Sequence, residues 1–452
     1  MERLAEEIRR RAGEAGPRLT ALRRHLHRHP EPAWGEYLTA SLVARALQDA
    51  GFRLTLGANA LRPSARPRQP EAAFCTAQSG RALNEGADPT LVACMAGGLT
   101  GLWGDLDLDS PGTPEDERGP LVAFRFDMDA NAGITEATDK DHFPAAQGFA
   151  SCHAGCMHAC GHDGHVALGV ELARLLGGLR DELSRHLSGR IRLIFQPAEE
   201  ISIGARDMIA AGALDGVEAI YGAHIWSEVD AGTVSCQPGP RMANTDWFHI
   251  DIEGVSAHGS MPHKGVDAVV VGAEMVNGLQ VLVSRDVSPF DPVVVTVGEF
   301  HGGEARNIMA GHAYLSGTVR TWTEKLRREV PDRLERIVSK MGHAFGAKVK
   351  FTFEEGNAGL ANDPVCAEVA RRAVVDMLGE SAVSDYRGTL SGEDFSEYLN
   401  IVPGVFCFVG TRNPEVGASH PQHSCHFTID ESVLAKGSMV AAQWACRMLA
   451  AE

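Results

Sequence analysis

The chain has 452 residues, and its 42 Lys and Arg against 59 Asp and Glu give a formal net charge of −17 with histidine neutral. Hydrophobic residues at 44% and charged residues at 22% are globular values, so the composition argues against disorder, and the length predicts about two to three domains. The acidic balance leaves no basic footprint for nucleic acid and disfavours an acidic membrane surface as a partner.

The N-terminal residues alternate charged with apolar side chains and lack the apolar core of about 7 to 15 residues that a signal peptide needs. No apolar run reaches the roughly 18 residues of a membrane span. Ten cysteines are spread through the chain and cluster only at Cys152, Cys156 and Cys160. This pattern favours reduced thiols and a metal ligand over disulfides, so we expect a cytoplasmic protein.

The first third of the chain predicts two helices, a strand and an insertion. The helices fall within 19–51, with a break at His29-Pro30-Glu31-Pro32 and an end at Gly51. A strand is expected over 52–56. Residues 57–90 are rich in Ala, Arg, Pro and Gly without a clear period, which predicts an irregular or helical insertion.

The following segment alternates strands with a helix. Apolar runs at 101–108 and 120–126 flank a turn-rich loop, a helix is predicted over 164–176, and a β-rich run at 190–195 follows. Such alternation favours an α/β fold with a mixed, mostly parallel sheet, whose active site lies at the carboxyl ends of the strands.

Residues 246–353 have their own pattern, with strands arranged around helices at 267–283 and 326–345. The order β-α-β-β-α-β predicts an inserted α+β domain of ferredoxin-like type. The chain then returns to an α/β pattern. We therefore expect a discontinuous first domain over 1–242 and 354–452, interrupted by an inserted domain over 243–353.

The densest chemical feature is the run Cys-Met-His-Ala-Cys-Gly-His-Asp-Gly-His at 156–165, directly before a helix. Thiolate and imidazole are good ligands for zinc and other late first-row metals. Cys160 and His162 are placed to face one metal from the turn. Asp163 and His165 are equally well explained as capping residues or as supports for the ligands.

A second feature is the carboxylate pair Glu199-Glu200 at a strand end. Neighbouring buried carboxylates are costly unless one binds a cation and the other acts as a base, although a solvated helix N-terminus explains such a pair equally well. His224 follows an apolar run, where a core position is the alternative to a ligand. His423 has His420 and His426 as rival ligands.

Together these segments resemble the amidohydrolase branch of the dimetal aminoacylase and carboxypeptidase metallopeptidases, clan MH. The matching stretches lie in family order over residues 20–440 and are FRFDMDA, MHACGHDGH, LIFQPAEE, GAHIW, SAHG, GTVRT, SGEDF and HSCHFTIDE. The resemblance implies a phosphorylase/hydrolase-like catalytic domain, in which the inserted domain serves dimerisation and acts as a lid.

The resemblance also implies roles for individual residues. Two divalent ions, Mn²⁺ or Zn²⁺, would be held by Cys160, His162, Glu200, His224 and His423. Glu199 would be the general base, and His258 would polarise the scissile carbonyl in the active site of a partner subunit. Arg306 and Asn307 match the position that binds the substrate carboxylate. Two departures from the family pattern are Ile308-Met309 after Asn307 and Cys425 in place of a proline.

The N-terminal third, with its insertion, resembles the large-subunit type of p-aminobenzoyl-glutamate hydrolase and the indoleacetyl-aspartate hydrolases. This resemblance implies hydrolysis of N-acyl conjugates of acidic amino acids by a homodimer or together with a paralogous second subunit. A general N-acyl amino acid deacylase or a dipeptidase is the main alternative. An inactive relative that binds small anions is disfavoured because none of the expected ligands, nor the base, is missing.

Overall fold

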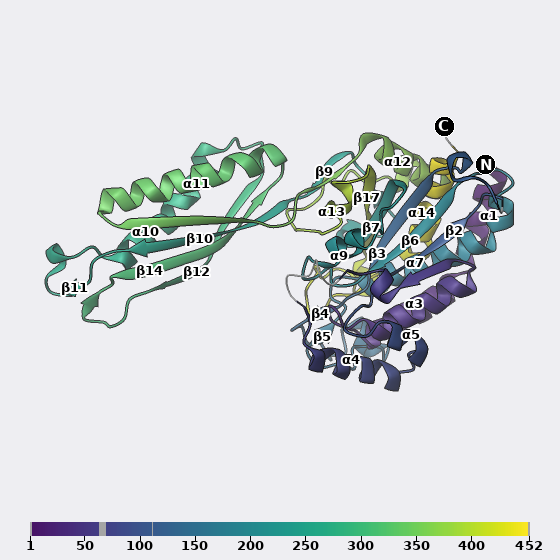
Figure 1. Ribbon diagram of the computed structural model, residues 1–452, viewed down its shortest axis with the longest axis horizontal. Helices are drawn as coiled ribbons and strands as arrows, with labels where there is room; N and C mark the ends of the chain where they lie inside the picture. Colours follow the sequence, from purple (N-terminus) through teal and green to yellow (C-terminus); the bar gives the residue numbers. More distant parts are fainter. Residues whose placement is uncertain (1, 63–68, 111, 451–452) are drawn as a thin grey trace. The chain divides into compact units, whose positions relative to one another are not determined.

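The computed structural model describes residues 2–62, 69–110 and 112–450. It divides into two compact units (Figure 1). Unit 1 comprises Met1–Gly239, Ala361–Arg387 and Glu397–Glu452, and unit 2 comprises Pro240–Leu360 and Gly388–Ser396. We expected an inserted domain over 243–353; unit 2 begins at Pro240, continues to Leu360 and takes in a second short segment.

Unit 1 is built on a seven-stranded sheet with the order β1-β2-β6-β3-β7-β17-β8. In chain order these strands are β1 (Arg53–Leu56), β2 (Leu102–Asp107), β3 (Leu121–Asp127), β6 (Arg190–Gln196), β7 (Val217–Asp230), β8 (Val234–Ser235) and β17 (Gly404–Arg412). The central strands β6, β3, β7 and β17 run parallel, and the outer strands pair antiparallel. Because β3 is buried at every residue, its near-continuous apolar run fits the centre of such a sheet. The expected mixed, mostly parallel α/β fold is confirmed.

Helices pack around this sheet. They are α1 (Glu2–Gly13), α2 (Gly16–Arg28), α3 (Tyr37–Asp49), α7 (His162–Gly178), α12 (Pro364–Leu378) and α14 (Val433–Leu449). Helix α7 contacts β3, β6 and β7, and α14 contacts α7, α12 and β17. Phe124, Tyr221 and Trp444 meet in the core with ring centroids 5.4–5.5 Å apart. Burial of such aromatic side chains is a main source of core stability.

The expected insertion after β1 is partly helical. It contains α4 (Ala72–Asn84), and α5 (Pro89–Cys94) follows it. Asp88 caps α5 by accepting hydrogen bonds from the N–H groups of Thr90 and Leu91, as an N-cap aspartate is expected to do. Residues 63–68 of the insertion lie outside the described residues.

Unit 2 follows the predicted β-α-β-β-α-β order. Its elements are β10 (Asn244–Glu253), α10 (Ala268–Val281), β12 (Val293–Gly302), β14 (His312–Thr321), α11 (Glu324–Phe345) and β15 (Lys348–Glu355). The strands form an antiparallel sheet with the order β12-β14-β10-β15, which is the ferredoxin-like arrangement. Helices α10 and α11 contact each other and the sheet, around a core that includes Ile250, Leu315 and Leu334.

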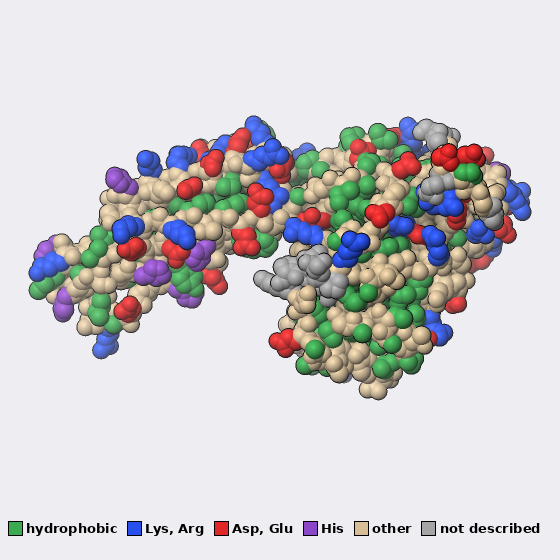
Figure 2. All heavy atoms as spheres, in the orientation of Figure 1, with side chains coloured by type: hydrophobic (Ala, Val, Ile, Leu, Met, Phe, Trp, Pro, Cys, Tyr) green, Lys and Arg blue, Asp and Glu red, His purple; other side chains and the backbone are tan. Residues whose placement is uncertain are grey.

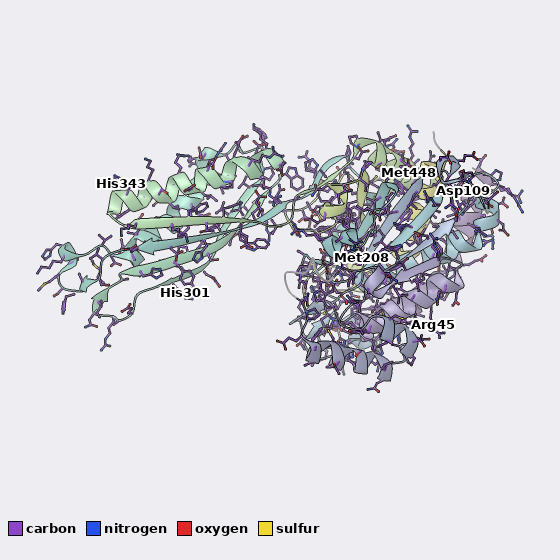
Figure 3. All side chains as sticks on the ribbon, in the orientation of Figure 1. Arg45, Asp109, Met208, His301, His343 and Met448 are labelled. Carbon is purple, nitrogen blue, oxygen red and sulfur yellow. The ribbon has the colours of Figure 1, made fainter. Side chains whose placement is uncertain are left out.

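The sheet of unit 2 also carries aromatic rings along its strands. His301 of β12, which Figure 3 labels, stacks on Tyr314 of β14 with ring centroids 4.9 Å apart, and His249 of β10 lies 5.3 Å from the same tyrosine. Ala268–Asp286, made of α10 and the π-helix Leu282–Asp286 that continues it, is long and apolar enough to span a membrane by length and composition. Here this helix packs on β10, β12 and β14.

Figure 2 shows acidic and basic side chains interspersed over the visible face.

The remaining short elements connect these parts. They are α6 (Phe143–Ala146), α8 (Arg180–Leu183), α9 (Gly204–Ala210), α13 (Ser396–Leu399), β4 (Asn131–Ala132), β5 (Cys156–Met157), β9 (Gly239–Met242), β11 (Ala257–His258), β13 (Ile308–Met309) and β16 (Leu360–Asn362).

Candidate active site

The five residues expected to bind metal come together at one place in unit 1. Cys160 directly precedes the N-cap residue of α7, and His162 is the first residue of that helix. Glu200 lies in the turn after β6, His224 lies in β7 and His423 precedes α14. The side-chain donor atoms of Cys160, His162 and His224 lie within 4.8 Å of one another, as do those of Cys160, Glu200 and His423. Cys160 belongs to both trios, so its sulfur lies close to the donor atoms of all four other residues.

Individual distances define the cluster. The Sγ atom of Cys160 lies 3.5 Å from Nε2 of His224. The Glu200 carboxylate lies 3.9 Å from Nε2 of His162 through one oxygen and 3.5 Å from Nε2 of His423 through the other. Each of the three imidazoles therefore has its Nε2 atom near the thiol or the carboxylate.

Main-chain carbonyls fix the orientation of two of these rings. His162 donates its Nδ1–H to the carbonyl oxygen of Asp129 at 2.8 Å, and His224 donates its Nδ1–H to the carbonyl oxygen of Ile225 at 2.8 Å. A neutral imidazole that donates from Nδ1 keeps the lone pair on Nε2. This is the tautomer that a metal-binding histidine needs.

The cluster contains buried polar atoms that a cation would satisfy. Nε2 of His162 and Oε1 of Glu200 are buried and have no hydrogen-bond partner among the described residues. Buried polar atoms are normally paired, so each such orphan requires an explanation. A divalent ion accepts electron pairs from thiolate, imidazole and carboxylate at once, so the donor set fits a metal centre.

The titration of these groups reflects their crowding in a buried place. Burial and the nearby Glu200 raise the pKa of the Cys160 thiol well above its usual value. Burial, reinforced by Asp129 and Asp127 and opposed by His162, raises the pKa of Glu200 to about 7. A bound cation reverses this effect because it favours the ionised form of each ligand.

Asp129 supports the carboxylate pair. One oxygen of its buried carboxylate accepts a hydrogen bond from the Glu199 N–H at 2.9 Å, and the other accepts one from the Glu200 N–H at 3.0 Å. Asp129 had no predicted role of its own. Its position after the carboxyl end of β3 is the signal that marks it, the same signal that marked Glu199 and Glu200 after β6.

His165 and Asp127 form a second support. His165 donates from Nδ1 to the Asp127 carboxylate at 2.5 Å and accepts a hydrogen bond on Nε2 from the Ile225 N–H at 2.9 Å. Both ring nitrogens are therefore engaged, and the ring braces β7 next to His224. Asp127 also accepts from Arg125 at 2.6 Å.

Asp163 belongs to a different network. Its buried carboxylate lies 2.8 Å from Nε of Arg23 and 2.8 Å from Nδ1 of His27. His27 in turn lies 2.9 Å from the Glu136 carboxylate. Asp163 thus ties the first turn of α7 to α2.

Glu199 is buried, with one carboxylate oxygen within 4.8 Å of the donor atoms of His162 and Glu200. The residue before it, Ala198, has φ 57°, and His423 has φ 66°. A left-handed backbone at residues other than glycine costs on the order of 1–3 kcal/mol and clusters at functional sites. The N–H of His423 also donates to the carbonyl oxygen of Ala159 at 2.8 Å, which pins its loop beside Cys160.

The rival histidines are placed differently. His426 lies 2.9 Å from the Asp139 carboxylate through Nε2, and the His420 ring lies 5.3 Å from the His426 ring. Of these histidines, His423 is the one whose donor atom lies with those of Cys160 and Glu200.

An apolar pocket of about 730 Å³ opens beside the cluster. Its edge includes Glu200 and His423, and its walls include Trp34, Phe74 and Ile134. Trp34 and Phe74 were not predicted site residues. Phe74 lies on α4, in the insertion whose sequence shows no clear period.

The three remaining predicted site residues lie in unit 2. His258 is in β11, and Arg306 and Asn307 directly precede β13. The Gly259 N–H donates to the Asn307 carbonyl oxygen at 2.9 Å, so the paired strands bring these residues onto one ribbon. Nδ1 of the exposed His258 accepts a hydrogen bond from the Ser260 N–H at 3.2 Å, so a neutral ring carries its proton on Nε2.

Comparison with known proteins gives consistent relatives. Residues 123–447 match the family described as Peptidase family M20/M25/M40. N-acetyl-L-cysteine deacetylase of Bacillus subtilis (strain 168) is 32% identical over 431 residues, which cover 95% of this chain and 88% of the relative. One of the subunits of p-aminobenzoyl-glutamate hydrolase of Escherichia coli (strain K12) is 35% identical over 437 residues, 95% of each chain.

A solved structure agrees. A Bacillus subtilis protein described as a dinuclear metal binding peptidase from the M20 family has a TM-score of 0.73 and 28% identity, over 97% of this chain and 99% of that one. The resemblance inferred from the motifs is confirmed by the family match. The chain belongs to peptidase family M20/M25/M40 and is a hydrolytic enzyme.

Proposed function

We propose that this enzyme is a two-metal amidohydrolase that releases the free amino acid from N-acyl amino acid conjugates, with aroyl- or arylacetyl-glutamate and -aspartate, such as p-aminobenzoyl-glutamate, as preferred substrates. The observation that carries the proposal is the convergence of five metal-binding side chains, with buried unpaired donor atoms, beside an apolar pocket.

Cys160, His162, Glu200, His224 and His423 would hold the metals, and the solved relative described as dinuclear supports a count of two. Divalent ions at such a centre stabilise negative charge on a substrate carbonyl oxygen and make water more acidic. The mixed donor set accepts Mn²⁺ or Zn²⁺.

Glu199 would move the proton. Its carboxylate lies beside the donor atoms of His162 and Glu200, and its backbone is held by Asp129. It would take a proton from the attacking water and deliver it to the leaving amide nitrogen, the two tasks of a general acid–base residue. The amine then leaves as the free amino acid.

Residues of unit 2 would hold the substrate. His258 is exposed, and its Nδ1 accepts a hydrogen bond so that the ring proton lies on Nε2, which suits a donor to the developing oxyanion. Arg306 would bind the substrate carboxylate, because a guanidinium pairs with a carboxylate through two parallel hydrogen bonds. We propose that His258 acts on the active site of a partner subunit, which requires a homodimer or a paralogous second subunit.

The pocket supports an aromatic acyl group. Trp34, Phe74 and Ile134 are apolar, and flat apolar walls beside a few polar atoms are typical of sites for aryl ligands. The similarity to p-aminobenzoyl-glutamate hydrolase supports the same substrate class. The similarity to N-acetyl-L-cysteine deacetylase supports a second candidate, general N-acyl amino acid deacylation.

All ten cysteines are free thiols, which supports a reducing, cytoplasmic location.

The test is release of free amino acid from p-aminobenzoyl-, indoleacetyl-, benzoyl- and acetyl-conjugates of acidic and neutral amino acids, with Mn²⁺ or Zn²⁺ added after chelation. The proposal predicts metal-dependent release chiefly from aryl conjugates of glutamate or aspartate. Arg306→Gln should reduce this preference for acidic conjugates, and Arg285→Gln, an exposed arginine of the same unit, should not. Release chiefly from neutral acetyl amino acids or dipeptides would replace the substrate assignment with the second candidate.

A further inference from the structure

A second group of metal-binding side chains lies outside the candidate active site. It consists of His29, Glu85, Cys152 and His153, which we call the peripheral cluster. Each residue offers one donor atom, and these atoms all lie within 4.8 Å of one another. None of the four belongs to the expected catalytic ligands or to the supports around them.

The cluster joins three segments that are distant in the sequence. His29 caps the C-terminal end of α2, Glu85 caps the C-terminal end of α4, and Cys152 and His153 lie in the loop before β5. The Cys152 N–H donates to the carbonyl oxygen of Arg28 at 2.9 Å, so the loop is held against the end of α2 by its backbone as well. The backbone therefore holds the loop that carries Cys152 and His153 next to His29.

Two distances within the peripheral cluster fit ligands of one cation, and a third is a hydrogen bond that the cation would replace. Nδ1 of His29 lies 3.6 Å from the Cys152 Sγ and 3.5 Å from Oε2 of Glu85. Oε1 of Glu85 lies 2.6 Å from Nε2 of His153. Oε2 of Glu85 is buried and has no hydrogen-bond partner in the described part of the chain.

The orientation of His153 also fits a metal ligand. Its Nδ1–H donates to the carbonyl oxygen of Pro30 at 2.9 Å, which leaves Nε2 directed at the Glu85 carboxylate. A carbonyl acceptor on one ring nitrogen is the usual arrangement behind a metal-binding imidazole. The side chains of His29, Glu85 and His153 are 19%, 16% and 11% exposed, and Cys152 is exposed, so a metal ion can reach the cluster from solvent.

We propose that His29, Glu85, Cys152 and His153 form a separate metal site that takes Zn²⁺ or a similar late first-row ion. Thiolate, imidazole and carboxylate are all zinc ligands, and the four donors match the number that tetrahedral zinc takes. The proposal goes beyond the proposed hydrolysis and does not depend on it.

The peripheral site has a consequence for the pocket wall. Helix α4 carries Phe74 of the pocket near its first turn and Glu85 at its end. An ion held by Glu85 together with His29 would tie α4 to α2. The site would thus hold the pocket wall in place while its ion takes no part in the reaction.

The experiment compares full-length wild-type protein with Cys152→Ser and Glu85→Gln, and with Cys94→Ser as the matched control for an exposed free cysteine. Metal-stripped proteins are loaded with Zn²⁺, dialysed, and measured for metal per chain by mass spectrometry. We expect Cys152→Ser and Glu85→Gln each to hold about one ion less per chain than wild type and Cys94→Ser. Circular dichroism verifies that each variant is folded.

Cobalt provides a direct readout of the sulfur ligand. In a Cys160→Ser background, which removes the thiol of the candidate active site, Co²⁺ should still give a thiolate-to-cobalt charge-transfer band. The band should disappear in Cys160→Ser/Cys152→Ser and remain in Cys160→Ser/Cys94→Ser. Equal metal content in wild type and both cluster variants, or a band independent of Cys152, would overturn the proposal and leave only a His153–Glu85 ion pair.

Discussion

His162 donates its Nδ1–H to the main-chain carbonyl oxygen of Asp129 across 2.8 Å. The side chain of the same aspartate accepts hydrogen bonds from the N–H groups of Glu199 and Glu200. Asp129, which follows β3, therefore orients both an imidazole from α7 and the carboxylate pair that follows β6. Its backbone carbonyl holds the imidazole, and its side chain holds the backbone of the carboxylate pair.

We predict that Asp129→Asn weakens metal binding and lowers kcat/KM by about 10- to 100-fold, as is typical when a residue behind the metal ligands is changed. An amide offers one acceptor oxygen and turns an N–H group toward a backbone N–H. Asp181→Asn, at an exposed helix position, is the matched control. Unchanged metal affinity and activity in Asp129→Asn would show that the two N–H bonds do not organise the site.

Glu199→Gln should keep the fold and the metals while lowering kcat by about 100- to 10,000-fold, because glutamine cannot accept and return a proton. Metal content and kcat are measured on the same preparation. Glu218→Gln, at an exposed position of β7, should retain wild-type kcat. Near wild-type turnover by Glu199→Gln would remove this residue from the role of base.

His258→Ala should lower kcat by about 100- to 1000-fold without loss of metal, as expected when one donor to an oxyanion is removed. Mixed dimers test where this histidine acts. Combining His258→Ala subunits with His162→Ala subunits should restore part of the activity, because one of the two sites then has both intact residues. Absence of complementation in verified mixed dimers would mean that His258 serves its own chain or has no catalytic role.

The buried His27 predicts how stability depends on pH. Burial and Arg23 oppose its charge, but hydrogen bonds to Asp163 and Glu136 outweigh them and raise the pKa of His27 above its usual value. A raised pKa in the folded state stabilises the protein below the unfolded pKa of about 6.5, and this stabilisation is lost as pH rises through the folded value.

His27→Gln should therefore be less stable than wild type by about 3 kcal/mol near pH 6, and the difference should shrink at higher pH. Denaturant unfolding at several pH values measures both quantities, with the exposed His186→Gln as control. A difference that stays constant or grows with pH would show that His27 is not the charged partner of Asp163 and Glu136.

Local patterns predict most of the fold. The buried apolar run of β3 and the alternation within 246–353 are short-range signals, and both the α/β sheet and the ferredoxin-like order follow from them. Helix α1 is absent from the predicted elements, although Leu4, Ile8 and Ala12 recur at helical spacing and are buried. The first predicted helices fall within 19–51.

Some residues of the site could be predicted from local sequence, and others are brought together only by folding. Cys160 and His162 share one turn, so their proximity is visible in the sequence. The roles of Asp129 and Phe74 depend on segments that meet only in the folded chain, and Phe74 lies in an insertion without periodicity. The peripheral cluster is a further case, because His29, Glu85 and Cys152 are far apart in the sequence and no local motif links them.

Metal-dependent hydrolysis is tested most directly by amino acid release from the conjugate that the enzyme cleaves fastest, measured on chelated protein before and after Mn²⁺ or Zn²⁺ is added back. We predict that chelation abolishes release and that metal restores it in wild type but not in His162→Ala, whose cluster lacks a central ligand. Full release by the chelated protein, or by metal-loaded His162→Ala, would contradict a metal centre at this cluster.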